Sequence, residues 1–137
     1  MAKVTATSLD GWKMQMSDGR HAWVADLPAP HGGADAGPGP FDHLLAALAS
    51  CACFITRRYA QTAKLPVQAA AVEAEGDWAK DASGQQVYQI RLVARYRGEL
   101  SEADLKRLEQ AANTCPVKQA FGGLIRIETT VGKLPSP

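Results

Sequence analysis

The segment FDHLLAALASCACFI, from Phe41 to Ile55, limits the possible folds of this chain more than any other. It follows residues 28–40, where Gly, Pro, Ala and Asp leave no helical or strand period, which predicts a loop. Pro40 suits the first turn of a helix, because its missing N–H costs little there. Leu and Ala then dominate to about Ala63, which predicts a long central helix, mostly buried in its first half and more exposed in its last turns. One stripe at helical spacing contains Leu44, Leu48, Cys51 and Ile55.

Strands are predicted on both sides of this helix. Before it, three short segments have extended or alternating patterns, at residues 3–7, 13–16 and 21–27, which predicts a small antiparallel sheet. After it, residues 65–79 and 85–98 read as a pair of strands joined near the turn sequence KDASGQ. The sheets are therefore expected to be antiparallel.

The last third of the chain is predicted as two helices and a strand. Residues 101–114 form a helix that begins with Ser101 and has Asp104 three residues on, as in a capping box. A short helix starts at Pro116 and ends before Gly122 and Gly123, and LIRIETTVG closes the chain as a strand. The order of elements predicts one α+β domain over residues 1–137 with helices packed on a sheet. A second subunit could cover so apolar a helix, so a homodimer is a hypothesis.

Composition excludes several classes of partner. The 15 Lys and Arg residues balance 14 Asp and Glu, and no basic cluster interleaved with aromatic residues occurs, so we expect neither nucleic acid nor a membrane surface as a partner. The N-terminal sequence has no signal-peptide pattern, which predicts a cytoplasmic protein. Three cysteines, an odd number, do not suit a secreted disulfide framework. Buried packing, metal ligation and redox chemistry remain as possible roles for the three cysteines.

Cysteine spacing narrows this choice. Cys115 directly precedes Pro116 and is expected at a helix N-cap, where unpaired N–H groups favour the thiolate, although a simply buried cysteine is an equal alternative. Cys51 lies in mid-helix, where packing is the commoner role. Cys53 points about 200° around the axis from Cys51, so a redox pair would join Cys115 to one of the two. The cysteines and three histidines lack the spacing of zinc sites, so no metal is expected.

Together, GPGPFDHLLAALASCACFI and NTCPVKQAF resemble the OsmC/Ohr family of thiol-dependent peroxidases. In that family a Gly-x-x-Pro sequence begins a long helix, a cysteine follows eleven residues after the proline, and a Cys-Pro pair lies near the C-terminus. Gly37 and Pro40 match the first motif, Cys51 the second, and Cys115 with Pro116 the third.

The resemblance implies an intertwined α+β homodimer with antiparallel sheets packed on a long central helix, and an active site at the subunit interface. It implies that Cys51 is the peroxidatic cysteine and Cys115 the resolving cysteine, with no metal or cofactor. A dithiol, such as one carried on a lipoylated protein, would regenerate the pair. Cys53 matches no family position and is interpreted as packing.

Two positions depart from the family pattern. Peroxidases of the family carry a glutamate after the proline, which holds an arginine over the reactive thiolate, whereas this chain has Phe41 there and Asp42 next. Arg20 is the first candidate for the supporting cation and Lys13 the second, with surface solvation as the alternative for both. His43 is expected to cap the helix or lie on the surface, and three aromatic residues are candidates for an apolar pocket: Trp12, Trp23 and Phe41.

Three functions remain open from the sequence. The first is a peroxidase that reduces organic hydroperoxides through the two-cysteine cycle. The second is a redox-sensing or small-molecule-binding protein that has kept the fold without fast peroxide chemistry, and the third is a structural homodimer with inert thiols.

Overall fold

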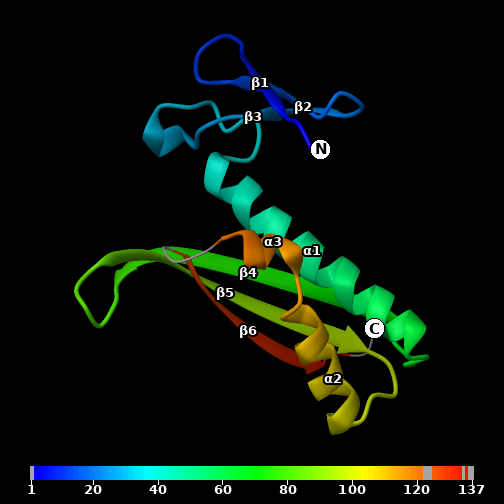
Figure 1. The fold of residues 1–137 in the computed structure, drawn as a ribbon. Helices are drawn as coiled ribbons and strands as arrows, with labels where there is room; N and C mark the ends of the chain where they lie inside the picture. The colour runs from blue at the N-terminus through cyan, green and yellow to red at the C-terminus, as the bar shows by residue number, and fades with distance from the viewer. Residues whose placement is uncertain (1, 122–124, 134, 136–137) are drawn as a thin grey trace. The chain divides into compact units, whose positions relative to one another are not determined.

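The computed structural model describes residues 2–121, 125–133 and 135, which fold into two compact units, residues 1–44 and 45–137 (Figure 1). The N-terminal unit contains strands β1 (Thr5–Ser8), β2 (Met14–Ser17) and β3 (Ala22–Ala25), which pair antiparallel in the order β1-β2-β3. The three predicted strands are thus confirmed. A short 3-10 turn, η1 (Ala29–His31), lies in the predicted loop, and helix α1 (Pro40–Thr62) starts in this unit and continues into the next. The single domain over residues 1–137 stays a prediction.

The loop of the N-terminal unit is organised by a buried carboxylate. Asp26 is only 3% exposed. Its Oδ1 accepts a hydrogen bond from the backbone N–H of Leu27 at 2.8 Å, and its Oδ2 accepts from Ala34 at 3.0 Å and Ala36 at 3.1 Å. A segment without helical or strand period is ordered here because one side chain satisfies three of its backbone donors.

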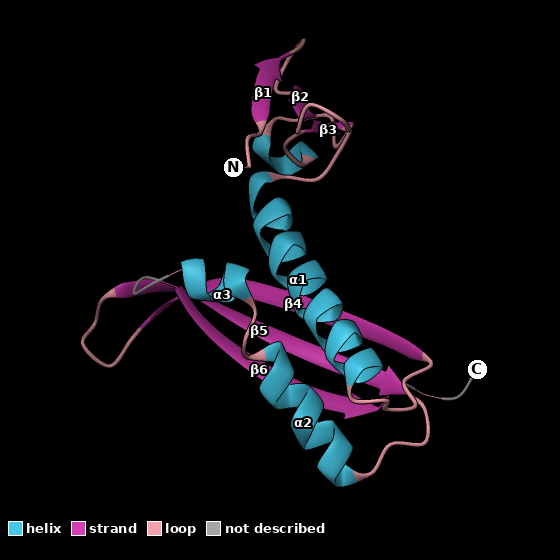
Figure 2. Cartoon of the chain, turned by 45° about the vertical axis from the view of Figure 1, so that its right-hand side comes forward, coloured by secondary structure: helices cyan, strands magenta, loops and turns pink. Residues whose placement is uncertain are grey.

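The C-terminal unit is a three-stranded sheet with three helices on one face (Figure 2). Strands β4 (Ala69–Lys80) and β5 (Gln86–Arg97) form the predicted antiparallel hairpin. Strand β6 (Ile125–Lys133) pairs with β5 in parallel, so the sheet is mixed rather than wholly antiparallel as expected. The connection through α2 (Glu102–Ala112) and α3 (Pro116–Ala120) carries the chain back to the end where β5 began, which a parallel pair requires.

The side chains of strand β5 alternate between an apolar face and a polar face of this sheet. Its helix-facing side chains alternate and are nearly all buried: Tyr88, Ile90, Leu92, Ala94 and Tyr96. Between them, Arg91 pairs with Glu75, and Arg95 pairs with Glu73 at 2.9 Å, on the open face. The partial alternation in the sequence therefore reflects a sheet that is covered on one face only.

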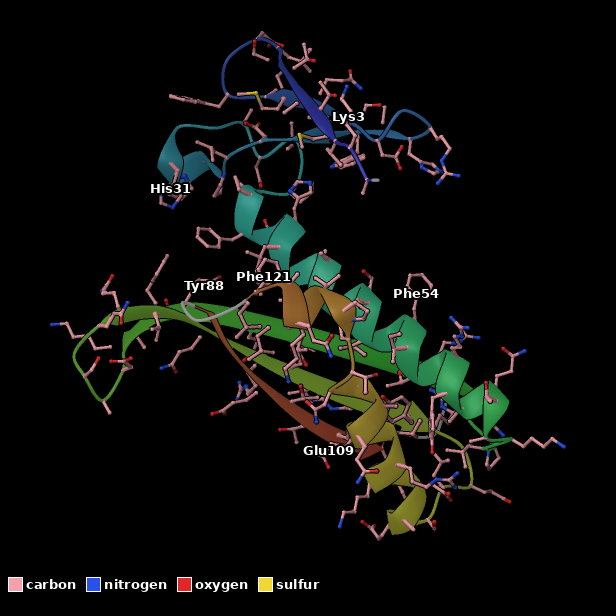
Figure 3. All side chains as sticks on the ribbon, viewed as in Figure 1. Lys3, His31, Phe54, Tyr88, Glu109 and Phe121 are labelled. Carbon is pink, nitrogen blue, oxygen red and sulfur yellow. The ribbon has the colours of Figure 1, made fainter. Side chains whose placement is uncertain are left out.

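Helix α1 packs on this sheet through small residues. The buried positions recur every four residues: Leu48, Ala52, Thr56 and Ala60. Of the predicted stripe only Leu48 is fully buried, and the buried face reaches the last turn because Ala60 packs in a cluster with Tyr96 and Leu108. The expectation of exposed last turns is therefore wrong for this face. The expectation of a mostly buried first half is also wrong, because Leu48 is the one buried residue among residues 40–51. Phe54 points away from the sheet and is 73% exposed (Figure 3).

The capping box predicted for α2 is present. Ser101 Oγ accepts a hydrogen bond from the Asp104 N–H at 3.2 Å, and Asp104 Oδ2 accepts from the Ser101 N–H at 3.0 Å. Helix α3 begins at Pro116, as predicted, whereas Gly122 and Gly123 lie outside the described residues. No helix of the described ranges combines the length and the apolar character needed to cross a membrane.

Candidate active site

Cys115 occupies the position predicted for it, at the N-cap of α3. Its side chain is fully buried, and its Sγ accepts a hydrogen bond from the backbone N–H of Lys118 at 3.4 Å. Its own N–H donates to the Ala112 carbonyl at 3.3 Å, so the turn that joins α2 to α3 fixes the cysteine backbone. The helix start therefore directs one backbone donor at the sulfur, as the Cys-Pro sequence predicts.

Cys51 lies beside Cys115, half-buried in the middle of α1. Burial is the main cause that raises the pKa of the Cys51 thiol, and interaction with the Cys115 thiol raises it further. The backbone N–H of Val117, in the first turn of α3, acts in the opposite direction on this pKa. The structure thus brings together two thiols separated by 64 residues in sequence, with a peptide N–H directed at each sulfur.

All three cysteines are free thiols, and Cys53 is separate from the pair. Cys53 lies near the buried hydroxyl of Tyr96, because negative charge on its sulfur is one cause that raises the pKa of Tyr96, after burial. The divergence of Cys51 and Cys53 around the helix leads to different neighbours for the two. The packing role of Cys53 stays a prediction.

Lys118 contributes a positive charge on α3. Its Nζ donates to Asn113 Oδ1 at 2.8 Å and to Thr129 Oγ1 at 3.3 Å. Neither acceptor is a carboxylate, so these contacts orient the ammonium group without neutralising it. No sequence signal indicated Thr129 on β6 or the Val117 N–H.

Asp42 and Arg20, the predicted supports of the thiolate, have local roles within the N-terminal unit. Asp42 Oδ2 accepts a hydrogen bond from the Gly39 N–H at 2.8 Å at the start of α1. The backbone N–H of Arg20 donates to Asp18 Oδ1 at 2.8 Å in the turn between β2 and β3, and the residue is exposed. Their proposed action on Cys51 stays a prediction.

Lys13, the second candidate cation, pairs with Asp10 at 2.9 Å. This pairing favours the surface role that was the alternative for Lys13, because the ammonium group already has a carboxylate partner.

His43 caps the start of α1, as one of its predicted roles required. Its Nδ1 lies 2.8 Å from the Gly39 carbonyl, and its Nε2 accepts a hydrogen bond from Trp23 Nε1 at 2.7 Å. The neutral Nδ1–H tautomer satisfies both contacts. Trp12 and Phe41 are exposed, and the aromatic pocket stays a prediction.

The arrangement of His, Cys, Asp and Glu side chains bears on metal binding. Within the ranges that the structure describes, no three His, Cys, Asp or Glu side chains gather closely enough to hold a metal ion. A mechanism without metal stays a prediction.

Comparison with known proteins identifies relatives by sequence model and by structure. The family model described as OsmC-like protein matches residues 32–130. No curated protein matches the chain in sequence.

Several solved structures share the fold. The OsmC-like protein of Mycoplasma pneumoniae superposes with a TM-score of 0.81 at 18% identity, and 98% of each chain is covered. An organic hydroperoxide resistance protein of Elizabethkingia anophelis gives 0.76 at 21% identity, over 98% of this chain and 96% of that one. The organic hydroperoxide resistance protein OhrB of Bacillus subtilis gives 0.71 at 23% identity, over 96% and 97%. These matches confirm the predicted α+β fold of this class.

Proposed function

Because this chain belongs to the OsmC-like protein family, we propose that it is a thiol-dependent peroxidase that reduces organic hydroperoxides through Cys51 and Cys115. The observation that carries the proposal is the contact between these two thiols. Structural relatives named as organic hydroperoxide resistance proteins support it.

In the first step, the Cys51 thiolate attacks the terminal oxygen of the hydroperoxide ROOH. An S–O bond forms and the O–O bond breaks, so that Cys51 becomes a sulfenic acid and RO⁻ leaves and takes a proton to become the alcohol. The Val117 N–H stabilises the thiolate that this step needs, and burial opposes it.

In the second step, Cys115 attacks the Cys51 sulfenic acid. A disulfide forms and the sulfenic oxygen leaves as water with the thiol proton. The backbone N–H of Lys118, which donates to Cys115 Sγ at 3.4 Å, holds this sulfur in place for the attack. A dithiol reductant, such as one carried on a lipoylated protein, then transfers two electrons and two protons and restores both thiols.

The supporting groups and the assembly belong to the same proposal. Arg20 would be the cation near the Cys51 thiolate and Asp42 the acid that orients it, in place of the family glutamate. We propose that the protein acts as a cytoplasmic homodimer. The exposed Phe54 on α1 supports a second copy as the cover of that helix.

The test is the thiol count and intact mass of reduced protein after one equivalent of cumene hydroperoxide, followed from milliseconds to minutes. We expect rapid loss of two thiols and two hydrogens, and no disulfide in Cys51→Ser. Cys53→Ser is the matched control, and it should behave as the parent. If Cys51→Ser loses thiols as fast as the parent, the assignment is wrong.

A slow redox sensor is the second candidate function. It is favoured by one observation, the raised pKa of Cys51, because a smaller thiolate fraction at neutral pH slows peroxide attack. Formation of the same Cys51–Cys115 disulfide over minutes, without turnover by a dithiol, would support the sensor over the enzyme.

A further inference from the structure

A groove of about 440 Å³ runs between α1 and the α2 segment of the C-terminal unit. Its lining comes from α1 on one side, with Ile55, Arg58, Tyr59 and Thr62, and from α2 and the turn that follows it on the other, with Arg107, Gln110, Ala111 and Thr114. The lining therefore contains two arginines and no acidic residue.

One end of the groove is lined by sequence neighbours of the two thiols, although neither sulfur lines it. Ile55 lies one helical turn after Cys51, and Thr114 directly precedes Cys115. Arg58 follows Cys51 by seven residues, two full turns, so both side chains leave α1 on the same face, about 10 Å apart along the axis.

The two helices run in opposite directions along the groove. Cys51 contacts Cys115 at one end, whereas at the other end Tyr59 accepts a hydrogen bond from Arg107 Nε at 3.0 Å. Along α1 the chain therefore runs from Cys51 to Arg58. Along α2 it runs from Arg107 toward Cys115, which follows this helix. The arginines therefore line the part of the groove that lies away from the thiols.

The arginine end offers unused donors. Within the described part of the chain, the guanidinium of Arg58 has no hydrogen-bond or ion-pair partner. Arg107 lies over the Tyr59 ring, 5.7 Å from its centroid, and its Nη1 lies 3.6 Å from Asp104 Oδ1, which leaves further N–H groups free. A guanidinium presents paired N–H groups that match a carboxylate.

The floor of the groove is apolar. Ile55, Ala111 and the Tyr59 ring lie between the two ends. The Thr62 and Thr114 hydroxyls donate to the carbonyls of Arg58 and Ala111, at 3.1 Å and 2.8 Å, so their hydrogens are not available to a ligand. An apolar body can therefore pass over these residues without leaving a threonine donor unpaired, and the exposed Gln110 side chain keeps its amide in water.

We infer that this groove binds amphipathic carboxylates, with the carboxylate on Arg58 and Arg107 and the apolar body directed toward the thiols. Binding of the carboxylate requires only the groove and does not depend on peroxidase activity. Its use in catalysis rests on the proposed function, and there it selects organic hydroperoxides that carry a carboxylate about two helical turns from the peroxide group.

The test is calorimetric and NMR titration of the reduced protein with decanoate, and with 1-decanol as the neutral analogue. Arg58→Gln and Arg107→Gln are expected to weaken decanoate binding about tenfold each, as loss of a charge-assisted hydrogen bond does. Arg57→Gln is the matched control, because Arg57 is exposed next to Arg58 but does not line this groove. Decanoate binding should also weaken as salt is raised.

Three outcomes would overturn the inference: no saturable binding of decanoate, equal binding of decanol, or equal losses in Arg57→Gln and Arg58→Gln. If Arg107→Gln does not fold by circular dichroism, Arg58→Gln decides, since its side chain has no partner within the described ranges. Titration of Cys51→Ser, which requires no turnover, separates failure of this site from failure of the proposed peroxidase.

Discussion

Tyr96→Phe is expected to stabilise the protein. The Tyr96 side chain is 1% exposed, and its hydroxyl is a buried polar atom without a hydrogen-bond partner within the described residues. Burial raises the pKa of the Tyr96 hydroxyl, and an interaction with the neighbouring Thr56 hydroxyl, which donates its own hydrogen to the Ala52 carbonyl at 2.8 Å, only partly offsets this. An unpaired buried hydroxyl costs about 1–3 kcal/mol, and Phe keeps the ring, so the free energy of unfolding should rise by about 1 kcal/mol.

Tyr59→Phe is the matched control with the opposite sign. Its hydroxyl accepts the Arg107 hydrogen bond, so its removal should lower the free energy of unfolding by about 0.5–1 kcal/mol. Urea denaturation at equal protein concentration measures both variants, and an unchanged m-value shows that the unfolded states are comparable. A Tyr96→Phe variant less stable than the parent would mean that the hydroxyl is satisfied, and would refute the reasoning.

Three further predictions concern the helix start, a buried acid and the thiols. Ser101→Ala should lower the free energy of unfolding by about 1 kcal/mol through loss of the cap, whereas Ser101→Asp should keep most of it, as measured by thermal unfolding. Backbone hydrogen bonds outweigh the burial that opposes them and hold the pKa of Asp26 below its usual value of 3.8. Its ionised form therefore stabilises the fold above about pH 4, and stability is lost as pH falls through the lower, folded pKa. Asp26→Asn should make acid unfolding depend less on pH, and an unchanged profile would contradict this. Cys115→Ala should lower the pKa of Cys51, since the Cys115 thiol raises it, and iodoacetamide alkylation should then accelerate at lower pH. No shift of that alkylation profile would show that the thiols do not interact.

The elements with strong local signals could be predicted from the sequence. Helix α1 begins at Pro40 and ends at Thr62, within one residue of expectation, because proline at the first turn and a Leu/Ala-rich run act locally. The Ser101–Asp104 box and the Cys-Pro helix start were likewise found, since each is a contact within one turn.

What depends on distant contacts could not be predicted. The parallel pairing of β6 is set by where the crossover returns the chain, and no residue of β6 carries that information. The buried face of α1 is centred on Ala52, Thr56 and Ala60, because close packing on the sheet favours small side chains there over the larger apolar stripe. Thr56, a polar residue, is buried because its hydroxyl bonds its own helix.

The candidate site, like the fold, could be predicted from the sequence only in part. Cysteine spacing and the Cys-Pro sequence indicated Cys51 and Cys115, but the Val117 N–H belongs to a backbone that any residue would supply. The groove beyond the thiols requires two stripes on separate helices to run in opposite directions, and only the tertiary structure specifies this.

The parallel partner of β5 also sets an order in which the C-terminal unit assembles. The β4–β5 hairpin and the helices are local in sequence and can form early, whereas β6 closes last, after the crossover has been laid down. Cys115 lies on that crossover, and Cys51 precedes the hairpin. A growing chain therefore carries two separate thiols, and they come into contact only after α1 and α3 have packed together.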